Sequence, residues 1–89
     1  MQAVITVTGK DSVGIIAKVS QKCVDYNVNI IDISQSVLKD YFAMIMLVEI
    51  DKLSIPFTNF VDEMSNIGQT NGLSIHTMHE DIFNSMHKI

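Results

Sequence analysis

The chain has 89 residues, of which 47 % are hydrophobic and 18 % charged, and its formal net charge is −4. These values predict one globular domain, residues 1–89, and exclude a disordered chain. The basic residues are scattered lysines without an arginine, so we expect no nucleic-acid binding. No apolar run reaches the ~20 residues of a membrane span, and Met1-Gln2 does not open a signal peptide. The single Cys23 excludes an internal disulfide and predicts a cytoplasmic location without membrane association.

Residues 2–8 predict a half-buried strand, because their side chains alternate between an apolar and a polar face. The two faces carry Ala3, Ile5 and Val7 on one side, and Gln2, Thr6 and Thr8 on the other. Val4 adds an apolar residue to the polar face, as expected of a central strand.

The stretch from Thr8 to Ile16, T-G-K-D-S-V-G-I-I, predicts a turn from this strand into a helix. Gly9 can adopt a positive φ, and Ser12 is a good N-cap residue. Backbone N–H groups at such a turn can hold a small anionic or zwitterionic ligand. The same residues also suit an ordinary helix start.

Residues 12–26 predict an amphipathic helix. Its apolar positions recur every three or four residues at Ile15, Ile16, Val19, Cys23 and Tyr26. We therefore interpret Cys23 as a small core residue and not as a reactive thiol. Asn27 is a suitable residue to end the helix.

Two strands follow, over residues 28–38 and 41–50, joined by Lys39-Asp40. In the first, Ile31, Ile33 and Val37 share one face opposite Asp32, Ser34 and Ser36, which predicts an edge strand. The second is apolar on both faces, with Phe42, Met44, Met46, Val48 and Ile50 opposite Tyr41, Ala43, Ile45 and Leu47. It is therefore a central strand, or its second face is covered by another subunit.

Ser54 and Pro56 predict a second helix start, and Asn71-Gly72 its end. The apolar positions of this helix are Phe57, Phe60, Val61, Met64 and Ile67. Residues 73–79 predict a last strand. Residues 80–89 predict a short amphipathic tail that must dock on the sheet or on a partner, with Ile82, Phe83, Met86 and Ile89 on its apolar side.

The order β-α-β-β-α-β predicts an α+β, ferredoxin-like fold with a four-stranded antiparallel sheet and both helices on one face. Right-handed crossovers place strands 1 and 3 in the centre. Fold alone does not define function. The first loop lacks the C-x-x-C of a metallochaperone, the chain lacks the arginine of an acylphosphatase, and its central strands lack the basic surroundings of an RNA-recognition domain.

The stretch V-T-G-K-D-S-V-G-I-I-A-K-V, residues 7–19, followed by N-V-N-I-I-D-I, residues 27–33, resembles an ACT domain. The shared features are a G-x-D-x-x-G turn before the first helix and an N-I pair at the start of the second strand. The resemblance covers nearly the whole chain. It is closest to small free-standing bacterial ACT proteins, whose tail is similar to residues 79–87, and to the ACT units of the glycine cleavage system regulator. Ser12 departs from the proline or other helix starter that relatives often carry before Val13.

The resemblance implies a site for an amino acid between the first turn of one unit and the second strand of its neighbour. Carried over, this site comprises Asp11, Ser12, Val13, Gly14, Ile15, Asn29, Ile30 and Ile31. Turn N–H groups would hold the carboxylate, and Asp11 or Asn29 would meet the ammonium. Alternatively, these residues bind no ligand: Gly14 only allows close packing of the helix on the strand, and Asn29 only begins the second strand.

The resemblance also implies a homo-oligomer, expected to be a dimer, formed through the edge strand 28–38 or the tail. We expect no enzyme and no cofactor, since no catalytic set of residues is legible. The predicted function is a regulatory module that binds an amino acid or similar small molecule and acts either through a second protein or by changing its own assembly. The alternative is a structural protein–protein interaction module without a ligand.

Three histidines offer a further hypothesis, metal binding, which we do not adopt. His76 and His79 are three residues apart and point to opposite faces of a continuous strand. They could converge only if the strand ended at Thr77. His87 lies in the tail, so these histidines are expected to be solvated or packed against the tail.

Overall fold

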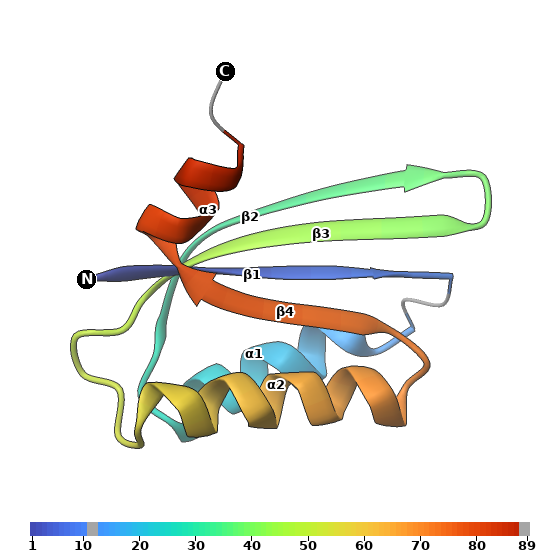
Figure 1. Ribbon diagram of the computed structural model, residues 1–89. Helices are drawn as coiled ribbons and strands as arrows, with labels where there is room; N and C mark the ends of the chain where they lie inside the picture. The colour runs from blue at the N-terminus through green and yellow to red at the C-terminus, as the bar shows by residue number, and fades with distance from the viewer. Residues whose placement is uncertain (11–12, 88–89) are drawn as a thin grey trace.

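The computed structural model describes residues 1–10 and 13–87. The elements follow the predicted order: β1 (Gln2–Gly9), α1 (Ile15–Asp25), β2 (Asn29–Leu38), β3 (Tyr41–Glu49), α2 (Phe57–Thr70), β4 (Ser74–His79) and α3 (Glu80–Met86). The antiparallel sheet has the strand order β2-β3-β1-β4, so β1 and β3 are central, as predicted. Helices α1 and α2 cover one face and α3 lies on the other, which we call the open face (Figure 1).

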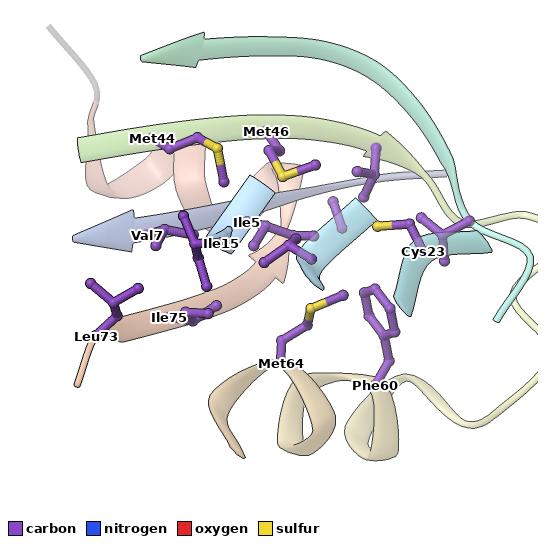
Figure 2. Close-up of a cluster of buried hydrophobic side chains, with 14 of the residues drawn as sticks. Ile5, Val7, Ile15, Cys23, Met44, Met46, Phe60, Met64, Leu73 and Ile75 are labelled. Atoms are coloured by element: carbon purple, nitrogen blue, oxygen red, sulfur yellow. The ribbon is translucent and has the colours of Figure 1, made fainter. Parts of the chain in front are cut away.

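The core lies between the sheet and the α1–α2 layer. Alternate residues of β1 and β3 point into it, among them Ile5, Val7, Met44 and Met46, all at most 1 % exposed. Figure 2 shows these side chains meeting Ile15 and Cys23 of α1 and Phe60 and Met64 of α2. Both apolar faces of the helices were therefore predicted correctly.

Both long helices end in the same backbone motif. After α1, Asn27 has φ 65°, and the N–H of Val28 donates to the carbonyl of Cys23 at 2.7 Å. After α2, Gly72 has φ 70°, and the N–H of Leu73 donates to the carbonyl of Gly68 at 2.8 Å. A left-handed residue followed by this long-range backbone bond is the Schellman motif, which confirms both predicted helix ends.

The edge strand β2 contains a β-bulge at Ile31, which corrects the predicted face pattern. Ile30 pairs with Val48 and Asp32 with Leu47, so Ile31 has no partner position on β3. The extra residue resets the alternation, and Ile30 and Ile33 pack against the core while Ile31 is 45 % exposed. Asp32, Ser34 and Ser36 lie on the open face, as predicted.

The predicted helix limits need two further corrections. Helix α1 begins at Ile15 and not at residue 12, and Gly14 occupies its N-cap position. Ser12, the predicted N-cap, lies outside the described residues. The tail helix α3 ends at Met86, and the expected contact of Ile89 lies beyond the described residues. Within the described ranges, no helix is both long and apolar enough to cross a membrane.

Candidate functional site

The first half of the predicted site lies at the start of α1. Gly14 has φ 73°, and its carbonyl accepts the N–H of Lys18 at 3.1 Å, which begins the helix. Among the described residues, leaving out its two chain neighbours, no atom lies within 4 Å of the position that a Cβ on Gly14 would occupy. Val13 is 86 % exposed, whereas Ile15 is buried. This half therefore combines an exposed apolar side chain with a left-handed glycine and the first-turn N–H groups of a helix.

Two of the predicted residues, Asp11 and Ser12, lie outside the described ranges. Lys10, the last described residue before them, lies beside the β2–β3 hairpin, because its Nζ is 5.6 Å from the ring centroid of Tyr41. The side chain of Tyr41 is 58 % exposed. The segment between β1 and α1 therefore begins next to the end of β2.

Gly9 and Gly14 have different structural roles from those expected. Gly14 adopts the positive φ that was predicted for Gly9. A Cβ on Gly9 would collide with the side chain of Leu73. Gly9 therefore permits close packing between β1 and the segment before β4. Gly14 is the position where the backbone adopts the left-handed conformation that favours glycine.

The second half of the predicted site lies at the opposite end of the sheet. Asn29 is exposed and pairs with Glu49, which in turn pairs with Gln2 at the start of β1. Ile31 is the exposed bulge residue, whereas Ile30 is half-buried against the core. Seven residue steps of about 3.4 Å along β1 separate the two halves by roughly 24 Å. One chain therefore does not bring the predicted residues together.

A groove of about 550 Å³ lies beside Asn29, and no motif in the sequence predicts it. Its lining residues are Val24, Asn27, Val28, Asn29, Glu49, Asp51 and Lys52. The α-ammonium of Met1 donates to Glu49 Oε1 at 2.9 Å and to Asp51 Oδ1. The hydrogen bond from this ammonium lowers the pKa of Asp51, and its bonds to Asp51 and Glu49 raise the pKa of the ammonium. Two carboxylates and one lysine therefore line this groove, which forms only when residues 24–29 and 49–52 fold together.

A second unpredicted groove, of about 560 Å³, separates α1 from α2. Lys18 Nζ donates to Asn71 Oδ1 at 2.6 Å, and the Tyr26 hydroxyl donates to Glu63 Oε1 at 2.8 Å. The hydrogen bond to Glu63 raises the pKa of Tyr26. These two hydrogen bonds join α1 to α2 and its C-terminal end across the groove.

The histidines do not converge. β4 continues through His79, so His76 and His79 point to opposite faces, as the strand pattern predicted. His79 stacks on Phe57 at 4.1 Å between ring centroids, and His87 stacks on Phe83 at 4.2 Å. In the described ranges, no three His, Cys, Asp or Glu residues are grouped to hold a metal ion.

Cys23 lies on the buried side of α1 and is 0 % exposed. Burial raises the pKa of its thiol to about 11, so the thiol is protonated at neutral pH. Its prediction as an inert core residue is confirmed.

Strand order, helix layer and element sequence define a ferredoxin-like βαββαβ module. A model of the ACT domain matches residues 1–77, and the chain therefore belongs to the ACT domain family. ACT domains are regulatory modules that bind small molecules, and the family is not a catalytic one.

The relatives support this membership over the whole chain. A UPF0237 protein of Listeria innocua is 43 % identical over 89 residues, which is all of both chains. An ACT domain protein from Streptococcus pneumoniae has 43 % identity and a TM-score of 0.80, and the match covers 93 % of each chain. A putative glycine cleavage system transcriptional repressor has 26 % identity and a TM-score of 0.69 over 85 % of this chain and 43 % of that one.

Proposed function

We propose that the chain is a non-catalytic regulatory module that binds an amino acid, or a similar small zwitterion, between two copies of itself. The observation that carries this proposal is the separation of the two half-sites. They lie at opposite ends of β1, and β2 forms an exposed edge of the sheet that spans the same length. A second copy paired along this edge would supply the half that one chain lacks.

The register supports an antiparallel pairing of the two β2 strands. Val37, near the end of β2, pairs with Phe42, which pairs with Gly9 just before the first half-site. A two-fold axis perpendicular to paired β2 strands places the beginning of each strand beside the end of the other. Asn29 of one copy would then approach the α1 start of its partner, and the dimer would contain two equivalent sites.

The chemistry of the paired halves suits a zwitterion. The chain has no arginine, so the first-turn N–H groups of α1 would hold the carboxylate. The carboxamide of Asn29, together with Asp11 from the resemblance, would accept hydrogen bonds from the ammonium. Val13 and Ile31, both exposed, would cover the apolar part of the ligand. We propose the cytoplasm as the place of action, since free amino acids and a reduced thiol are found there.

A thermal-shift screen of the common amino acids tests this function. A ligand present at about 100 times its Kd raises the free energy of unfolding by roughly 2.7 kcal/mol, which is a clear shift for a domain of this size. We expect Asn29→Ala to abolish the shift and Asn59→Ala, an exposed asparagine on α2, to retain it. A ligand that stabilises Asn29→Ala as strongly as the natural chain would contradict the proposed site.

The exposed apolar residues on the open face favour a second candidate, an interaction module without a ligand. Ile45 is 44 % and Met86 is 66 % exposed. If no amino acid shifts the melting temperature of a stable oligomer, this candidate replaces the first, and a regulated protein partner becomes the object of the search.

A further inference from the structure

Helix α3 covers only part of the open face. It packs on β1 and β4 near the start of β1, as Figure 1 shows. Beneath it Val4 is 3 % exposed, although its face points away from the core. Further along the same face, Ile45 is 44 % and Tyr41 is 58 % exposed. The open face therefore has a half covered by α3 and a half that we call the uncovered half.

The outer side of α3 is also unburied. The helix has seven residues, and none of them is buried. Ile82 is 53 % and Met86 is 66 % exposed, although both belong to its apolar stripe. So short a helix is marginal in water unless it packs on other elements. The structure therefore provides an apolar ridge, Ile82 and Met86, beside the uncovered half.

A groove of about 450 Å³ separates the ridge from the uncovered half, and among the described residues no Asp, Glu, Lys or Arg lines it. Its lining is Thr6, Thr8, Ala43, Met44, Ile45, His76, Met78, Phe83, Met86 and His87. Two cross-strand rows form its floor: Ile45, Thr6 and His76, then Ala43 and Thr8. Because these lining residues carry no carboxylate, a second copy meets no like charge inside the groove, whereas Asp32 lies elsewhere on the open face.

We propose that the open face is an interface between two copies of this chain, in which the Ile82–Met86 ridge of each copy occupies the groove of the other. A two-fold interface requires a surface that is complementary to itself, and a ridge lying beside a groove fulfils this condition. The contact buries the exposed apolar residues of both copies and completes the packing of α3. This interface is separate from the β2 edge, so both can form in the same assembly.

Light scattering after gel filtration tests the interface. Ile45→Lys introduces a charge on the floor of the groove, and Met86→Lys introduces one on the ridge. Both positions are exposed in one chain, so each variant is expected to fold with an unchanged circular dichroism spectrum. We expect each to halve the mass of the assembly or to raise its dissociation constant at least tenfold. Thr58→Lys, an exposed control on α2, should keep the natural mass.

Cross-linking identifies the contact itself. Chains carrying Met86→Cys are mixed with chains carrying Ala43→Cys and oxidised, while the buried Cys23 stays protonated and inaccessible. The mixture should form a heterodimeric disulfide, and a mixture of Thr58→Cys and Ala43→Cys should not. A monomeric natural chain would overturn the proposal, as would an assembly whose mass neither lysine variant changes. A dimer that survives both variants would leave the β2-edge interface of the proposed function intact.

Discussion

Gly14 is the residue whose backbone most directly shapes the proposed site. Its φ of 73° is strained for side chains, and none of the described residues beyond its chain neighbours lies within 4 Å of the position of a Cβ. Gly14→Ala should therefore act through strain alone and lower the free energy of unfolding by about 1 kcal/mol. Gly14→Asn should lower it less, because asparagine tolerates left-handed backbone. Urea titrations of both variants check this, and equal stability of Gly14→Ala and the natural chain would contradict it.

At Gly68 the lack of space, and not the backbone φ, disfavours any side chain. A Cβ there would lie 2.7 Å from the carbonyl oxygen of Leu73 and 3.2 Å from the backbone N of Ile75. Helix propensity favours Gly68→Ala, but backbone atoms cannot give way as a side chain can. We expect a net destabilisation of about 1–3 kcal/mol in thermal unfolding. Asn66→Ala, on the exposed side of α2, is the matched control and should be close to neutral.

The raised pKa of the buried Cys23 thiol makes the free energy of unfolding depend on pH in the alkaline range. Its pKa is raised from 9.0 to about 11 by burial, so the unfolded chain loses this proton first. The stabilisation from the buried thiol is complete below pH 9 and is lost as pH rises towards 11. Unfolding of the natural chain and of Cys23→Ala, compared from pH 7 to 11, should show a steeper loss in the natural chain. Parallel curves would contradict the raised pKa.

At the scale of elements, the sequence predicts those helices and strands whose positions follow from local residue patterns. Apolar spacing identifies both long helices, Asn27 and Gly72 mark their ends, and the doubly apolar residues 41–50 identify a central strand. The bulge at Ile31 is not predictable in this way, because N-I-I-D-I alternates acceptably in either register. Only the pairing of Ile30 with Val48 and of Asp32 with Leu47 reveals it. Likewise, Ser12 has the chemistry of an N-cap, but the helix begins after Gly14.

The candidate site was predictable only as two separate segments. Gly14 and Asn29 are identified by motif, but the distance between them depends on the whole sheet. The groove beside Asn29 depends on Glu49 and Asp51, which no motif connects to it.

Helix α3 should be the least stable of the helices. It buries none of its residues, whereas α2 buries Phe60, Met64 and Gly68. Native-state hydrogen exchange should therefore show faster exchange in α3 than in α2. If the open face is an interface, protection of α3 should rise with protein concentration. Equal protection of both helices at micromolar concentration would contradict this account of α3.

At the scale of the whole molecule, the chain is an ACT domain whose proposed ligand site needs two copies. The α1 start and the β2 start are far apart in one chain, and the exposed β2 edge offers the way to join them. Regulation would then follow from linkage, because a ligand that binds only the paired form favours pairing.

Complementation between two variants tests this central claim most directly. Gly14→Trp blocks the α1 half-site and Asn29→Ala removes the β2 half-site, with Gly14→Asn as the folded control for the first. Each variant alone should lose binding of the amino acid found in the screen, measured by titration calorimetry. A refolded equimolar mixture should recover about a quarter of the natural sites, since half of its dimers are mixed and each has one intact site. Recovery of no sites, from two folded and dimeric variants, would show that the site does not lie between two copies.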